Sequence, residues 1–235
     1  MSCPGPYAGA VTLIDPLAEP AAVKPRMRGW LHLWSFVVAV AAGIVLVSLA
    51  GATVSAEAAV AVAVYSLTVC GVFGISALYH RRTWVTARAR TIMKRLDHAM
   101  IFVFIAGTYT PFAVLALPER TGAIVLAVVW GGALGGVVLK MAWPDAPRWV
   151  GVPFYLALGW VAIFVVPDLL HRGGVAALVL IIVGGAFYSL GAVFYALRRP
   201  VGWPATFGFH EFFHAATVIA AACHHVAIWL VLYAG

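Results

Sequence analysis

The sequence HEFFH, at residues 210 to 214, contains the residue types of a metal site. It matches the H-E-x-x-H pattern in which zinc proteases place two histidine ligands on one helix, with a glutamate as general base. Four residues of α-helix rotate by about 400° and rise by about 6 Å, so His210 and His214 would share one face. We therefore expect a pair of metal ligands, although the motif opens a run of unusually apolar sequence.

Further ligand and acid–base candidates occur earlier in the chain. Ser76 and His80 are four residues apart, and Asp97 follows seventeen residues after His80. A Zn²⁺ ion held by three imidazoles keeps one tetrahedral position open for water, whose pKa it lowers to about 7. We expect His80, His210 and His214 to be the ligands. Asp97 is then either the general base that orients this water or a direct fourth ligand, and Ser76 either holds His80 or stabilises a developing oxyanion.

The composition shows which kind of protein must position these groups. Hydrophobic residues make up 64% of the 235 and charged residues only 10%, with a mean hydropathy of +1.00. A soluble domain is typically about 45–50% apolar and about 25% charged. The chain is therefore predicted to be an integral membrane protein of the cell membrane, surrounded by membrane lipids. Its net charge of +7 comes from residues between apolar runs, which argues for membrane orientation and against a nucleic-acid partner.

Seven stretches are long and apolar enough, or nearly so, to cross a hydrocarbon core about 30 Å thick. The sequence thus predicts an all-α fold, a seven-helix transmembrane bundle. The expected spans are residues 30–50, 58–79, 99–117, 122–141, 150–166, 174–197 and 206–234.

The distribution of lysine and arginine predicts how these spans are oriented. Of the 15 basic residues, all but Arg120 and Arg172 fall on the side of the N-terminus. Because cytoplasmic loops carry the excess of Lys and Arg, we expect a cytosolic N-terminus and a C-terminus outside. Residues 1–23 are predicted to be a disordered cytosolic tail and residues 24–235 the transmembrane domain. The widely spaced Cys3, Cys70 and Cys223 form no disulfide or zinc pattern.

This orientation brings the candidate groups to one membrane depth. His80 ends the second span at the cytosolic side, Asp97 begins the third, and His210 and His214 begin the seventh. The remaining histidines are expected to do less. His32 and His98 are read as interfacial or hydrogen-bonded polar side chains, and His224, about 15 Å deeper than His214, as a packing residue.

Four segments together are similar to a known family. SALYH (76–80), RLDH (95–98), GTYTPF (107–112) and HEFFH resemble haemolysin III proteins, the bacterial branch of the group that includes the adiponectin receptors. The resemblance implies seven helices with a cytosolic N-terminus. It also implies a zinc ion held by His80, His210 and His214, with Asp97 contacting it through water and Ser76 close by. In those receptors the first histidine of the pair is not followed by glutamate. Glu211 is therefore expected to be solvated or paired with Arg198 or Arg199.

Several functions remain open at this point. The wider superfamily includes alkaline ceramidases, which implies a metal-dependent hydrolase of lipid amide or ester bonds. A receptor-like protein or membrane-lipid homeostasis factor with a structural zinc ion is a second reading. A pore-forming cytolysin, after the family's haemolytic label, is a third, and an intramembrane protease that depends on Glu211 is the weakest. The sequence leaves the substrate and the oligomeric state open.

Overall fold

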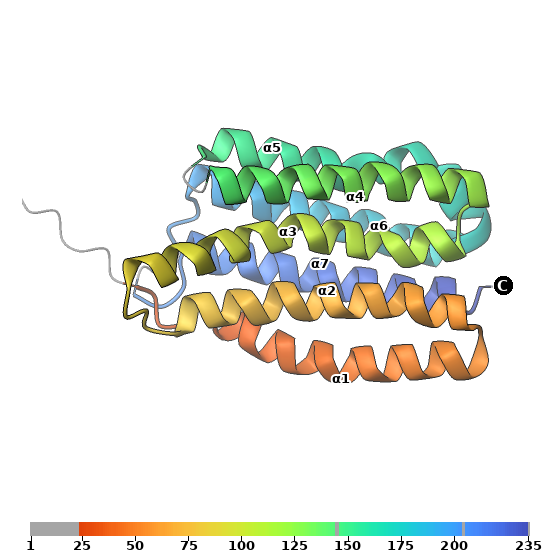
Figure 1. Ribbon diagram of the computed structural model, residues 1–235, viewed down its shortest axis with the longest axis horizontal. Coiled ribbons are helices and arrows are strands. Elements are labelled where there is room, and N and C mark those ends of the chain that lie inside the picture. Colours follow the sequence, from red (N-terminus) through yellow and green to blue (C-terminus); the bar gives the residue numbers. More distant parts are fainter. Residues whose placement is uncertain (1–23, 144–145, 204, 235) are drawn as a thin grey trace, which may run out of the picture.

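The structure is a computed structural model that describes residues 24–143, 146–203 and 205–234, so the predicted tail at 1–23 lies outside the described residues. The described chain is all-helical, as predicted (Figure 1). Its elements are α1 (Trp30–Thr53), α2 (Ala56–Arg81), α3 (Ala87–Leu115), α4 (Glu119–Ala142), α5 (Arg148–Gly159), the 3₁₀ helix η1 (Trp160–Val165), α6 (Val166–Leu197) and α7 (Phe209–Leu232).

The helices form a bundle in which neighbours in sequence are neighbours in space. α1 packs on α2, α2 on α3, α3 on α4 and α6 on α7, and α7 also contacts α1. Figure 1 shows them lying along the long axis of the molecule. Many large apolar side chains, including Leu67 and Phe164, point outward and are exposed. This outer surface suits a lipid environment, and six helical stretches are long and apolar enough to cross a membrane.

One of these six stretches contains two of the predicted spans. The stretch Arg148–Leu197 is 50 residues long. The run is interrupted at η1 and again at Gly174, whose φ of 78° and ψ of 169° are not helical. α5 packs against α6, so the chain turns back between them. The Tyr109 hydroxyl bridges the first of these interruptions, at η1, where it donates to the Gly159 carbonyl (2.6 Å) and accepts from the Ala162 amide (2.7 Å).

α3 begins twelve residues before the predicted third span. Its first turn is capped by Thr86, whose side chain accepts from the Ala89 amide at 3.2 Å. Four basic residues follow inside the helix: Arg88, Arg90, Lys94 and Arg95. Charged residues mark the edge of an apolar run but do not end a helix. The helix therefore begins before the predicted membrane span does. Asp97 and His98 consequently lie on a rigid helix.

The segment before α1 crosses the end of the bundle where α2 ends and α7 begins. We call residues 24–29 the N-terminal strap. The amides of Arg26 and Met27 donate to the carbonyls of Ala205 and Thr206, at 3.0 and 3.2 Å. Gly29 ends the strap with a φ of +82°, and a Cβ there would lie 2.9 Å from the His80 Cβ. Glycine is therefore required both for the conformation and for the close approach to α2.

Candidate metal centre

Three histidines from two helices meet at this end of the bundle. His80 lies in the last turn of α2, and His210 and His214 lie in the first turns of α7. One ring nitrogen of each lies within 4.8 Å of the others, and the Nε2 atoms of His80 and His210 are 3.1 Å apart. His80 and His214 are buried and His210 is half-buried. The structure thus brings together the three residues that were predicted to be ligands.

The donor set and its spacing fit a small divalent cation. Two imidazole nitrogens bound to tetrahedral zinc at about 2.0–2.1 Å are about 3.3 Å apart. The 3.1 Å between His80 and His210 is close to this value. A pair alone at this distance would also suit an N–H···N hydrogen bond. The third imidazole inside the same 4.8 Å radius is what favours a metal ion over a simple hydrogen bond.

Asp97 lies beside the three imidazoles rather than among them. Its Oδ2 is 3.8 Å from His80 Nε2 and 3.8 Å from His98 Nδ1. The hydroxyl of buried Ser76 lies near the Asp97 carboxylate. At these distances the carboxylate is beyond direct hydrogen-bond reach of both rings. The catalytic roles of Asp97 and Ser76 stay predictions.

His98 is a packed polar contact, one of the two interpretations given for it. Its Nδ1 donates to the Lys94 carbonyl at 2.7 Å, which is one turn earlier in α3. Its Nε2 is 3.4 Å from the Tyr195 hydroxyl of α6. Since Nδ1 carries the proton in this arrangement, Nε2 accepts from the tyrosine. His98 therefore ties α3 to α6 beside Asp97.

The expectation for Glu211 was wrong. Its side chain is fully buried, with 0% exposure, and pairs with Arg28 of the strap rather than with Arg198 or Arg199. Its Oε2 also accepts from the Gly208 amide at 2.8 Å, which caps the start of α7. Both carboxylate oxygens are thus engaged. Glu211 lies about 100° around the helix from His210, so HEFFH is a histidine pair with a structural glutamate.

The expectation for His32 was also wrong. The side chain is 3% exposed, and its ring stacks on His214 with centroids 3.8 Å apart and planes 14° from parallel. Among the described residues neither ring nitrogen has a hydrogen-bond partner, although the His214 backbone lies nearby. The sequence shows His32 only as the third residue of a span. Its place beside His214 depends on the packing of α1 against α7, which no local pattern encodes.

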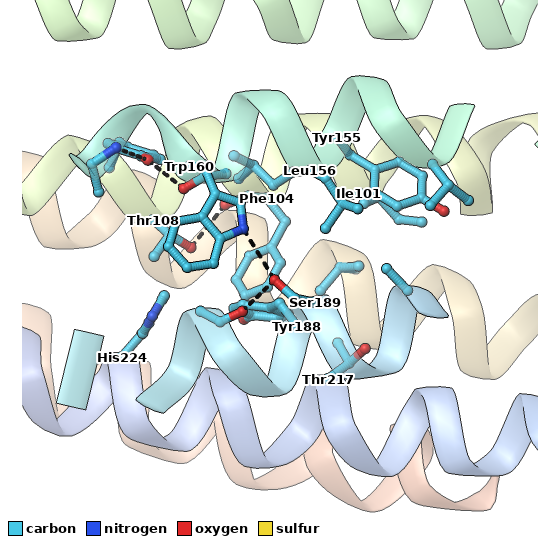
Figure 2. Close-up of a pocket in the computed structure, with 18 of the residues that line it drawn as sticks. Ile101, Phe104, Thr108, Tyr155, Leu156, Trp160, Tyr188, Ser189, Thr217 and His224 are labelled. Carbon is cyan, nitrogen blue, oxygen red and sulfur yellow. Dashed lines mark hydrogen bonds between the residues drawn. The ribbon is translucent and has the colours of Figure 1, made fainter. Parts of the chain in front are cut away.

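A cavity of about 610 Å³ extends from His210 and His214 into the bundle. Asp97, His210 and His214 are among its lining residues. Mostly apolar side chains of α3, α5, η1 and α6 form much of the rest, and Figure 2 shows Ile101, Phe104 and Leu156 among them. His224 stands farther along its wall, where its Nε2 donates to the Ile181 carbonyl at 3.2 Å. The hydrogen-bonded packing role expected of His224 is therefore confirmed. The volume lies within the usual range of ligand pockets, about 300–1,000 Å³.

Comparison with known proteins agrees with this arrangement. Residues 21–225 match the sequence profile described as "Haemolysin-III related". The chain is 36% identical over 112 residues to "Hemolysin-3 homolog" of Bacillus subtilis (strain 168), covering 48% of this chain and 53% of that protein. It thus spans about half the length of this relative. It is 30% identical over 163 residues to "Hemolysin-3" of Bacillus cereus, covering 69% and 74% of the two chains.

A plant protein extends the likeness. "Heptahelical transmembrane protein ADIPOR2" of Oryza sativa subsp. japonica is 30% identical over 176 residues, which are 67% of this chain and 76% of the relative. The family profile covers most of the sequence, including His80, Asp97, His210 and His214. Six helical stretches suited to a bilayer accompany it. The chain belongs to the haemolysin-III related family of multi-pass membrane proteins.

Proposed function

We propose that this protein is a zinc-dependent membrane hydrolase that cleaves an amide or ester bond of a lipid near the cytosolic leaflet. The observation that carries the proposal is the convergence of His80, His210 and His214, the last two of which line a largely apolar cavity. A three-histidine donor set with a free coordination position is typical of catalytic zinc rather than of structural zinc.

The membrane arrangement that goes with this function has seven crossings, with the N-terminus in the cytosol and the C-terminus outside. The 50-residue run Arg148–Leu197 supports two crossings rather than one. At 1.5 Å per residue it would measure about 75 Å as one straight helix, more than twice the hydrocarbon thickness of about 30 Å. The name "heptahelical" carried by the plant relative points the same way.

The residues around the site have distinct parts in the proposed reaction. A bound zinc ion supplies Lewis acidity toward a carbonyl oxygen and toward water. The Asp97 carboxylate accepts a proton from the attacking water, and this proton then passes to the leaving amine or alcohol as the acyl bond breaks. Ser76, whose hydroxyl lies near Asp97, would orient the carboxylate. The products are a fatty acid and an amine or alcohol.

Lipid reaches the cavity from the side of the bundle in this proposal. Trp160 and Ile163 of η1 and Ile182 of α6 line the cavity and are also exposed on the outer surface. Figure 2 shows Trp160 beside Ser189 of α6, and its Nε1 donates to the Ser189 hydroxyl at 3.1 Å. An acyl chain in the bilayer would enter the cavity between η1 and α6 without passing through water.

The test is made on protein purified in detergent with its metal content measured. We expect about one zinc ion per chain and hydrolysis of at least one member of a panel of ceramides, acyl amides and phospholipids. When a chelator removes the metal, hydrolysis should stop, and it should return when zinc is added. A protein that holds zinc but cleaves no lipid of the panel would contradict the proposal.

A receptor-like role with a structural metal is the second candidate, and one observation favours it. The three imidazoles join α2 to α7, two helices that make few other contacts with each other. A metal at this point would hold the bundle together. In that case His210→Ala should lower the thermal unfolding midpoint far more than Asp97→Asn. Small and equal shifts for both variants would count against a structural metal.

A further inference from the structure

The cavity has one charged end. Three cationic side chains line it, each from a different helix: Lys94 of α3, Lys140 of α4 and Arg148 of α5. Asp97 and His98 belong to the same part of the lining. Farther along, the wall is formed by apolar residues such as Ile101, Phe104 and Leu156 (Figure 2). The cavity is thus amphipathic, and its polar end adjoins the three histidines.

The burial of Lys140 beside the cavity favours an anion near its ammonium group. Its side chain is 7% exposed, and its ammonium group packs against Gly151 of α5, where a Cβ would lie only 2.7 Å from Nζ. Among the described residues no carboxylate lies within ion-pair distance of it. Lysine is almost never buried unless it is paired. An interfacial lysine would extend its ammonium group to the headgroups, but the ammonium group of Lys140 lies against α5 and lines the cavity.

Arg148 is oriented toward the same region. Its guanidinium donates to the Tyr195 carbonyl at 3.2 Å and lies 4.8 Å from the centre of the Tyr195 ring. The Tyr195 ring in turn lies 6.0 Å from the His210 ring. One aromatic ring therefore separates Arg148 from the candidate metal ligands. A group held by Arg148 and Lys140 would lie within a short molecule's reach of the reacting bond.

We propose that Lys140 and Arg148 bind the anionic group, a carboxylate or a phosphate, of an amphiphile whose apolar chain fills the rest of the cavity. Such an anion compensates the buried ammonium of Lys140 and meets the fork of donors on Arg148, which suits both kinds of oxyanion. This inference names the class of substrate or product and to that extent rests on the proposed hydrolase function. The binding itself requires no hydrolysis.

The binding experiment uses the full chain in nonionic detergent and probes that share one chain length. Laurate, lauryl phosphate and lauryl alcohol are compared by calorimetry, with inorganic phosphate as a fourth probe. We expect at least one of the two anionic amphiphiles to bind about tenfold or more tightly than the alcohol. Inorganic phosphate should bind far more weakly than lauryl phosphate, because it lacks the chain. Equal affinities for the alcohol and both anions, or no binding of any amphiphile, would overturn the proposal.

Variants then assign the preference to the two side chains. Lys140→Met and Arg148→Gln should each weaken the binding of the preferred anion about tenfold, without weakening that of lauryl alcohol. Arg88→Gln, which removes the same charge from an exposed position outside the cavity, should change neither. Wild-type affinity for the anion in both cavity variants would refute the assignment.

Stability and metal content separate this inference from its alternatives. If Lys140 served only the fold, Lys140→Met would lower the unfolding midpoint. We expect the ligand-free variant to unfold at the wild-type temperature or above, because an unpaired buried charge has been removed. Metal content should remain at the wild-type level. A chain that binds anions through Lys140 but holds no zinc would refute the hydrolase and leave anion binding standing. A chain that holds zinc and hydrolyses lipid, but binds anions no more tightly than alcohols, would refute anion binding and leave the hydrolase standing.

Discussion

α7 carries two pairs of histidines, and the two pairs have different environments. His210 and His214, in the first turns, are four residues apart and converge with His80 of α2. His224 and His225, nearer the other end, are adjacent in sequence, and their side chains point in different directions. His224 bonds to the Ile181 carbonyl of α6, whereas His225 accepts from Trp229 Nε1 at 3.0 Å and lies 3.4 Å from the Tyr65 hydroxyl of α2.

Helical spacing explains the difference. Residues four apart project from one face, whereas adjacent residues are separated by about 100°. The first pair can therefore share a cation, and each ring of the second pair finds its own hydrogen bond on a different neighbour. The number of histidines in an apolar helix says little about metal binding until their spacing is considered. Five predictions test or sharpen this contrast, beginning with the largest expected effect.

Removing a ring of the first pair should abolish metal binding. In His210→Ala or His214→Ala two imidazoles remain, too few to hold a divalent cation firmly. Elemental analysis of the purified variants should therefore give close to no zinc per chain. The matched controls are His224→Ala and His225→Ala, which should keep the wild-type content. Zinc lost equally from all four variants would remove the contrast between the two pairs.

Asp97→Asn should separate catalysis from metal binding. The amide cannot accept the proton from water, so we expect lipid hydrolysis to fall by about 10²–10⁴-fold. Zinc content should change little, because Asp97 lies beside the imidazoles and not among them. Asp168→Asn, in the first turn of α6, is the control. Loss of zinc in Asp97→Asn would instead identify Asp97 as a direct ligand.

Glu211→Gln tests whether the glutamate of HEFFH is structural. The change breaks a buried ion pair with Arg28, which costs about 3 kcal/mol when one partner is removed. For a chain of this size the unfolding midpoint should fall by about 5–10 °C. Hydrolysis per folded molecule should persist at low temperature. Wild-type stability combined with complete loss of hydrolysis would indicate that Glu211 has a catalytic role, as in the zinc-protease motif.

His32 provides a finer test, because its ring stacks on His214 of the first pair. His32→Ala leaves the His214 ring without its stacked neighbour and should weaken zinc binding about 10–100-fold. His32→Phe keeps a flat ring in the same place and should restore most of the affinity. Competition with a zinc chelator measures both. An equal loss in the two variants would show that His32 acts through its nitrogens.

The smallest effect is expected at the second pair. His224→Leu removes one hydrogen bond to the Ile181 carbonyl and should lower the free energy of unfolding by about 1 kcal/mol. The unfolding midpoint would then move by about 2–4 °C. Zinc content should stay at the wild-type level. A large loss of zinc from this variant would mean that the two ends of α7 are coupled.

The sequence predicts the helices of this protein well because apolar length and helical spacing are local properties. It identifies His80, His210 and His214 as a group for the same reason, since their depth follows from the positions of the span ends. His32 and Glu211 escape such reasoning. Their partners, His214 and Arg28, are more than 180 residues away in sequence, and only the packing of α1 and the strap against α7 brings them together. The cationic end of the cavity likewise depends on the meeting of three helices.

The strap has a consequence for how the protein is made. It pairs with residues 205 and 206, its Lys24 ammonium donates to the His80 carbonyl, and its Arg28 holds Glu211. The part of the described chain that the ribosome makes first must therefore wait for the last helix before it can take its place. A metal ion can be captured only after that final insertion, so zinc uptake during synthesis would report that the whole bundle has been assembled.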